Sequence, residues 1–188
     1  MYKRQPDGGW GWFKGMYPSQ EITLYILKGM SQLTELNAVE YNQQEKEMQM
    51  KALKFVDKQI QSDYEALQKI KNWQKNEISP LEIEYLFVRS QYRDIPELGS
   101  AREAIRYYTN LAEKQWNKQS IYEKGEIAWL MWRNGKKEVA GNILAWLRKT
   151  ASTSADKGMY WANNRRGENF FVSPIDTHCL LMALFNEV

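Results

Sequence analysis

Three short segments, SPLE, SIYE and SPID, constrain the fold of this chain more than any other feature of its sequence. They begin at Ser79, Ser120 and Ser173. In each, a carboxylate follows the serine by three residues, so that each of the two side chains can accept a hydrogen bond from the backbone N–H of the other residue. The proline of SPLE and SPID stands at the first helical position, where its missing N–H costs nothing. Each segment therefore predicts the beginning of an α-helix.

Apolar residues follow helical spacing over nearly all of the chain. A first helix is predicted over residues 19–36, with Ser19 as its N-cap. A second apolar stripe begins at Met48 and continues through Tyr64 and Leu67 toward Trp73. The buried face predicted for the first helix is its most apolar one, formed by Ile22, Tyr25, Ile26, Met30 and Leu33.

Five further helices are predicted after residue 78, and no segment shows the alternation of a strand. Gly135, in the segment RNGKK, suits the left-handed residue that follows a helix. Because helical spacing resumes at once after it, the helices on either side should form a tight antiparallel hairpin. Seven helices joined by short loops predict an all-α fold of stacked antiparallel hairpins.

Length and composition limit the classes of protein to consider. The 188 residues fit one domain, taken here as residues 1–188. The 26 basic and 23 acidic residues are spread along the chain, which argues against nucleic-acid binding. The single cysteine, Cys179, excludes an internal disulfide and a cysteine zinc cluster. No apolar run reaches membrane-spanning length, and we expect neither a cofactor nor membrane contact by this domain.

Two glycine-bearing turns end in aromatic residues, DGGWGW at residues 7–12 and KGMYW at residues 157–161. Such a turn bends the chain sharply and lets the aromatic side chains cover the end of a helix pair. If both turns lie at the same end of the fold, an exposed patch would be a partner-binding site. Its members would be Trp10, Trp12, Phe13 and Trp161. The structural turn residues are Asp7, Gly8, Gly9 and Trp10 in the first turn, and Gly158 and Trp161 in the second.

The sequence pattern does not place the candidate catalytic and ligand-binding side chains on a common face. His178 is the only histidine, and its side chain points about 100° away from that of Cys179 on a helix. Glu82 and Glu84 flank Ile83 on a predicted helix and so face differently. The spacing of Trp129, Trp132 and Trp146 favours core packing over a ligand groove. We therefore expect no enzyme.

The spacing of Gln5, Gly8 and Trp10 looks like the glutamine–tryptophan turn of α-α toroids, the architecture of terpenoid cyclases and prenyltransferases. The order of blocks from Gln5 to Val188, including SPLEIEYLFVRSQYRDIP and KGMYW, resembles the thioester-domain region of bacterial alpha-2-macroglobulins. The resemblance implies a partial or small toroid within a larger multidomain protein, periplasmic or anchored to the cell envelope. That parent would be an endopeptidase inhibitor that traps proteases, and this domain would contact its other domains.

One departure from the family concerns its covalent chemistry. The family closes a thioester within a Cys-x-Glu-Gln sequence, whereas Cys179 is followed by Leu-Leu and Met182. The motif is therefore expected upstream of Met1, or lost as in some members, and His178 is a weak candidate for the histidine that relays acyl transfer in relatives.

The alternative is a carbohydrate-processing or carbohydrate-binding toroid, which needs a tryptophan floor and, for hydrolysis, two carboxylates at glycosidase separation. A free-standing helical-repeat scaffold is a third possibility.

Overall fold

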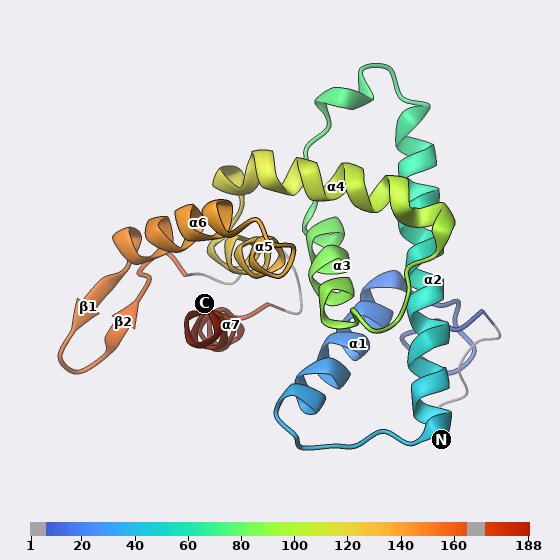
Figure 1. The fold of residues 1–188 in the computed structure, drawn as a ribbon, viewed down its shortest axis with the longest axis horizontal. Helices are drawn as coiled ribbons and strands as arrows, with labels where there is room; N and C mark the ends of the chain where they lie inside the picture. Colours follow the sequence, from blue (N-terminus) through green and yellow to red (C-terminus); the bar gives the residue numbers. More distant parts are fainter. Residues whose placement is uncertain (1–6, 165–171) are drawn as a thin grey trace. The chain divides into compact units, whose positions relative to one another are not determined.

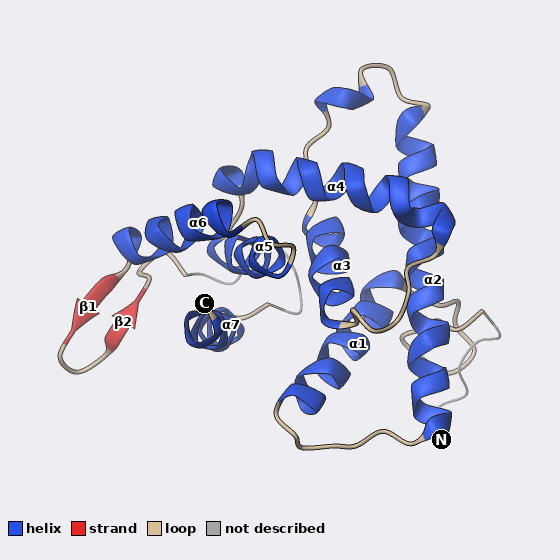
Figure 2. Cartoon of the chain, in the orientation of Figure 1, coloured by secondary structure: helices blue, strands red, loops and turns tan. Residues whose placement is uncertain are grey.

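The structure is a computed structural model that describes residues 7–164 and 172–188 (Figure 1). The described part is mostly helical and contains seven α-helices (Figure 2), which confirms the all-α prediction. The helices are α1 (Gln20–Glu35), α2 (Gln43–Gln68), α3 (Pro80–Gln91), α4 (Arg102–Gln115), α5 (Ile121–Arg133), α6 (Lys137–Thr150) and α7 (Pro174–Glu187). Short 3₁₀ turns cover Trp73–Lys75, Gly99–Ala101 and Trp116–Lys118. Gln5 lies outside the described residues.

The helices begin where their capping residues stand. Ser19 caps α1, and the capping boxes that start at Ser79, Ser120 and Ser173 are all formed at the heads of α3, α5 and α7. A fourth box, between Asn42 and Glu45, begins α2 five residues before the first apolar residue of the predicted stripe. Apolar periodicity missed this start, although the segment NQQE contains the capping signal.

The prediction that the chain contains no strand is wrong for one short segment. Strands β1 (Ser152–Ser154) and β2 (Gly158–Tyr160) pair antiparallel as a hairpin after α6. Gly158 has a positive φ of 65°, a conformation that glycine adopts at no steric cost. Strands of three residues are too short to show the alternation of apolar and polar residues. The sequence therefore indicated the glycine turn but not the pairing of the two strands beside it.

The chain divides into two compact units. The first unit contains residues 1–77 and 84–109, and the second contains residues 78–83 and 110–188. The prediction of a single domain remains a prediction.

In the first unit, helix α1 buries a different face from the one predicted. Leu24 and Leu27 are buried, whereas Tyr25 and Leu33 of the predicted face are exposed. The buried face also carries Lys28, whose Nζ lies 2.6 Å from Oε1 of Glu84 on α3, with both side chains largely buried. This ion pair places a lysine in the core, a position that a search for apolar stripes excludes.

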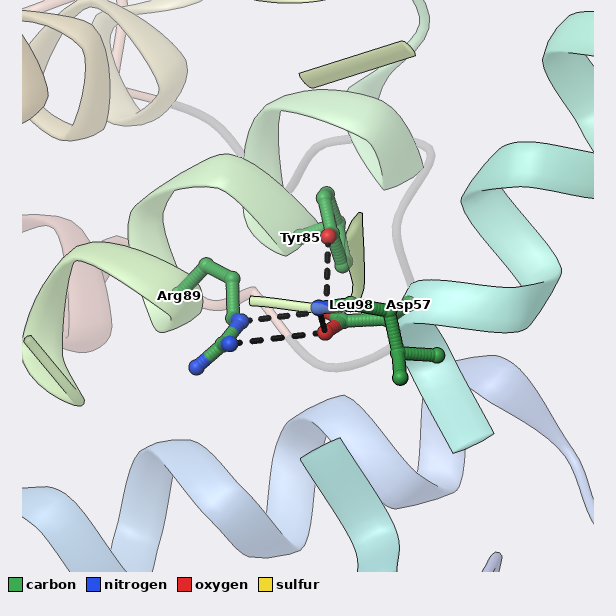
Figure 3. Close-up of polar contacts among 4 residues, drawn as sticks. All are labelled: Asp57, Tyr85, Arg89 and Leu98. Carbon is green, nitrogen blue, oxygen red and sulfur yellow. Dashed lines mark hydrogen bonds and ion pairs between the residues drawn. The ribbon is translucent and has the colours of Figure 1, made fainter. Parts of the chain in front are cut away.

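A second buried ion pair joins α2 to α3 in the same unit (Figure 3). Oδ1 of Asp57 accepts hydrogen bonds from the Tyr85 hydroxyl at 2.8 Å and from Arg89 Nε at 3.0 Å. Oδ2 accepts from the backbone N–H of Leu98 at 2.9 Å and from Arg89 Nη2 at 3.4 Å. We call these four residues the Asp57 cluster. Burial, followed by the charge of Asp57, raises the pKa of Tyr85, so its hydroxyl stays protonated and donates.

The second unit contains the predicted hairpin of α5 and α6, with Gly135 between them at a φ of +77°. Helix α7 packs against α5 at Gly125, where a Cβ would lie only 2.9 Å from a methyl carbon of Leu181. Trp129 is buried as expected, and its Nε1–H donates to Glu187 at 2.7 Å. The absence of a side chain at Gly125 therefore allows the close approach of α7 to α5.

The Asp57 cluster yields a stability prediction. Asp57→Ala leaves the Arg89 guanidinium buried without its counter-charge, and we expect the free energy of unfolding to fall by about 3–5 kcal/mol. The matched control Tyr85→Phe removes one hydrogen bond and should cost only about 1 kcal/mol. Urea denaturation followed by circular dichroism measures both. Equal losses in the two variants would contradict a dominant role for the ion pair.

Candidate functional site

The first glycine turn lies against helix α2. Gly8 has a φ of +104°, and a Cβ at this position would lie 2.4 Å from the backbone oxygen of Lys51. A Cβ on Gly9 would lie 2.8 Å from the ring of Phe55. Asp7 Oδ1 accepts a hydrogen bond from Gly9 N at 3.3 Å. Only glycine fits at both positions, because the backbone of the turn touches the helix directly.

Backbone hydrogen bonds of Trp10 attach the end of this turn to the start of helix α1. Its side chain is buried, and its backbone N–H donates to Thr23 Oγ1 at 2.9 Å. Its carbonyl accepts from the N–H of Ser19 at 2.8 Å, and Ser19 is the residue that caps α1. Trp10 and Ser19 therefore close a loop over residues 11–18, which we call the aromatic loop.

The aromatic loop exposes four large apolar side chains. Their exposed fractions are 41% for Trp12, 69% for Phe13, 47% for Met16 and 93% for Tyr17. Within the loop, Met16 N donates to Phe13 O at 3.1 Å, and a Cβ on Gly11 would lie 2.8 Å from Tyr17 O. The loop is folded on itself, yet it leaves these side chains uncovered.

The structure changes the membership of the predicted aromatic patch. Trp12 and Phe13 are exposed as required, but Trp10 and Trp161 are buried and cannot contribute to a surface. The sequence pattern did not predict Met16 and Tyr17 as members, because they lie outside the glycine turn on which the predicted patch was based. A run of large apolar residues before the N-cap, with no helical spacing, was the available signal.

Exposed lysines lie within the aromatic loop and on helix α2, which supports the turn before it. Lys14 is exposed within the loop. Lys51, Lys54 and Lys58 are exposed on α2 at the spacing i, i+3, i+7, which places them on one face of the helix. We call these three the lysine stripe. Because Gly8 touches the backbone of Lys51, the stripe begins beside the base of the loop.

The second predicted turn is structural. Gly158 lies in the β1–β2 hairpin, and Trp161 follows it into the core of the second unit. Trp161 Nε1–H donates to the carbonyl of Leu147 at 2.9 Å, and its ring stacks on Phe185 with centroids 6.4 Å apart.

The side chains considered for catalysis do not assemble into a site. The His178 ring lies 5.9 Å from the ring of Trp161, while Cys179 on the same helix is exposed. Glu82 is engaged in the capping box of α3, and Glu84 in the ion pair with Lys28. Among residues 7–164 and 172–188, no group of three or more histidine, cysteine or acidic side chains is placed to hold a metal ion.

A groove of about 690 Å³ in the second unit is lined by Lys124, Trp146 and Trp161, among others. The ammonium of Lys124 lies 4.6 Å from the ring centroid of Trp146 and also donates to the carbonyl of Gln119. Burial lowers the pKa of Lys124. Lys124 therefore covers one face of Trp146, while Trp161, which stacks on Phe185, is itself buried.

None of the described helices combines the length and the apolar character needed to cross a membrane. No family model, no curated protein and no solved structure matches the chain.

Gly8 provides a test of how the turn is attached. Gly8→Ala combines a positive φ with a clash against the backbone of α2, and we expect a loss of about 3 kcal/mol or more in the free energy of unfolding. Gly15→Ala is the matched control, since Gly15 has a φ of +90° but no atom within 4 Å of the added Cβ. It should cost about 1–2 kcal/mol from backbone strain alone. Thermal denaturation of both variants would reveal the difference, and equal losses would contradict contact with α2.

Proposed function

We propose that this chain is a non-enzymatic binding module whose aromatic loop docks onto an apolar, acid-rimmed surface of a partner protein. The observation that carries the proposal is the exposure of Trp12, Phe13, Met16 and Tyr17 on one short loop. Fully burying a side chain of the size of Phe or Met contributes about 1.5–3 kcal/mol. Large aromatic side chains that become fully desolvated also dominate the energetics of protein interfaces.

The base of the loop supports the same proposal. The Trp10–Ser19 bridge, the bond from Trp10 N to Thr23, and the contact of Gly8 with α2 hold both ends of the loop. A loop whose ends are held before binding loses less conformational entropy when it docks. The glycine turn thus contributes to binding indirectly, by presenting the exposed side chains that follow it.

Charge complementarity specifies the chemistry of the partner. Lys14 and the lysine stripe place positive charges in and beside the loop. A matching surface would carry an apolar centre with aspartates or glutamates at its rim. Such an arrangement speeds association at low ionic strength and orients the two surfaces.

On the resemblance described above, we place this module in a bacterial alpha-2-macroglobulin-like protease inhibitor. The parent would be periplasmic or anchored to the cell envelope, and would trap proteases after cleavage of a bait segment. The partner of the aromatic loop is then another domain of the same parent, while the proteases are the targets of the parent. A partial α-α toroid, with no cofactor, no nucleic-acid binding and no membrane contact by this domain, belongs to the same proposal.

The alternative is a carbohydrate-processing or carbohydrate-binding toroid. In the second unit, the rings of Trp146 and Trp161 are engaged by Lys124 and Phe185. A sugar ring would have to displace Lys124 in order to stack on that face of Trp146, and Trp161 is itself buried. The contacts favour the binding module, and cleavage of any member of a polysaccharide panel by the isolated chain would reverse that preference.

Sequencing the gene on both sides of this segment tests the family. We expect a signal peptide and a long multidomain chain with many β-domains, either with Cys-x-Glu-Gln before the glycine turn or without it. The first result would indicate a covalent trap and the second a non-covalent one. A short reading frame that begins at Met1 would refute the macroglobulin proposal.

Photo-crosslinking in the intact parent protein tests the docking role of the aromatic loop. With p-benzoylphenylalanine in place of Phe13, we expect one dominant crosslink to a segment outside residues 1–188, because the side chain is exposed here and would be covered in the assembly. The same replacement at Tyr25, an exposed aromatic on α1, is the matched control. Mass spectrometry identifies the crosslinked peptides.

In the same experiment, Tyr17→Ser should reduce the crosslink from position 13 by about tenfold, the effect of losing roughly 1.4 kcal/mol of contact energy. The melting temperature should hardly change, since the Tyr17 side chain is 93% exposed. Equal crosslinking from positions 13 and 25, or none from position 13, would contradict the docking role.

A further inference from the structure

The groove of the second unit contains a buried lysine that the proposed function does not use. Lys124 stands in the first turn of α5 and lines the groove, yet the residue is only 4% exposed. Lysine is almost never buried to this extent unless its ammonium is paired. The groove volume of about 690 Å³ is within the range of sites for small molecules. The environment of this amine therefore decides what the groove can do.

The described contacts of the Lys124 amine are with a carbonyl and an aromatic ring rather than with a carboxylate. Its Nζ donates to the carbonyl of Gln119 and lies 4.6 Å from the ring centroid of Trp146. The nearby carboxylate of Glu123 accepts the backbone N–H of Ser120 in the capping box of α5. A carbonyl and a ring offset only part of the cost of taking an ammonium out of water.

This environment favours the neutral form of the amine. Burial lowers the pKa of Lys124, and the charge of Glu123 opposes that shift only in part. The remaining charged residue of the described lining is Lys118, which has the same sign as the ammonium. A neutral amine that donates one N–H to Gln119 keeps a lone pair on nitrogen. A lysine desolvated in this way is a nucleophile toward carbonyl compounds.

Apolar side chains in the same groove indicate the kind of carbonyl compound that fits. Pro80, Ile121 and Trp146 contribute apolar surface to the lining. An aromatic ring on the ligand would bury its own apolar area there. Conjugation between such a ring and a C=N bond also makes an imine more stable toward hydrolysis than one formed from an alkyl aldehyde. Both considerations favour an aldehyde attached directly to an aromatic ring.

We infer that Lys124 is a covalent capture site for a small aromatic aldehyde, which it holds as an imine. The lone pair of Nζ attacks the carbonyl carbon, and the C=O bond opens to give a carbinolamine. The two protons of the amine then leave with the former carbonyl oxygen as one molecule of water, and the C=N bond forms. No group is oxidised or reduced. The site lies in the second unit and goes beyond the docking role of the aromatic loop.

Reductive trapping on the full chain tests the inference. Benzaldehyde below one equivalent, with sodium cyanoborohydride near neutral pH, converts each imine into a stable benzylamine that peptide mass spectrometry assigns to its lysine. We expect Lys124 to be labelled about tenfold or more above Lys118 and Lys149, since an exposed lysine with a pKa of about 10.4 stays protonated. Lys118 is the matched control, because it lines the same groove and is exposed.

A variant and a second aldehyde complete the test. Lys124→Met keeps an apolar stem of similar length and should remove the preferred label, leaving that of Lys118 and Lys149 unchanged. Butanal, which lacks the ring, should show a smaller preference for Lys124 than benzaldehyde does. The comparison among lysines uses the unsubstituted chain, so it decides even if the variant fails to fold. Labelling of Lys124 at or below the level of Lys118 would overturn the inference, and an equal preference with butanal would refute the aromatic class.

Discussion

The first unit depends on the buried carboxylate of Asp57. Its two oxygens accept four hydrogen bonds, from the hydroxyl of Tyr85, two nitrogens of Arg89 and the backbone of Leu98. Taking a carboxylate and a guanidinium out of water is costly, and their attraction compensates only when their geometry is held closely. The Asp57 cluster therefore sets the placement of α3 on α2, and apolar packing around it follows. Lys28 and Glu84 repeat the arrangement between α1 and α3.

Helix α2 connects the Asp57 cluster to the glycine turn that carries the aromatic loop and to the groove at the end of α1. Asp57 lies on its buried face, Phe55 and the backbone of Lys51 receive the glycine turn, and Gln49 lines the groove. The aromatic loop and the groove are thus supported by one rigid element. Rigid support matters for the aromatic loop, because a surface that is already ordered loses less entropy when it binds.

The two surfaces differ in the chemistry that they favour. The aromatic loop offers apolar area with nearby lysines, as expected of a docking surface between proteins. The groove at the end of α1 instead offers mainly polar groups, among them carboxylates and tyrosine hydroxyls. Neither resembles the arrangement of an enzyme, in which a nucleophile, a base and an orienting group lie within hydrogen-bonding reach of one another. This contrast is why we propose a binding module.

The sequence by itself determined where α1, α3, α5 and α7 begin and where α5 ends, because capping depends on residues a few positions apart. Ser79, Ser120, Ser173 and Gly135 act as predicted, since a serine, a carboxylate or a glycine at these positions acts on its own turn of backbone. Only the tertiary structure decided which face of α1 is buried, since the partner of Lys28 is 56 residues away in the sequence. It likewise decided that Trp10 and Trp161 are buried while Phe13 and Tyr17 are exposed. The groove at the end of α1 was also beyond sequence reasoning, because a cavity arises from segments whose distance in space the local pattern does not specify.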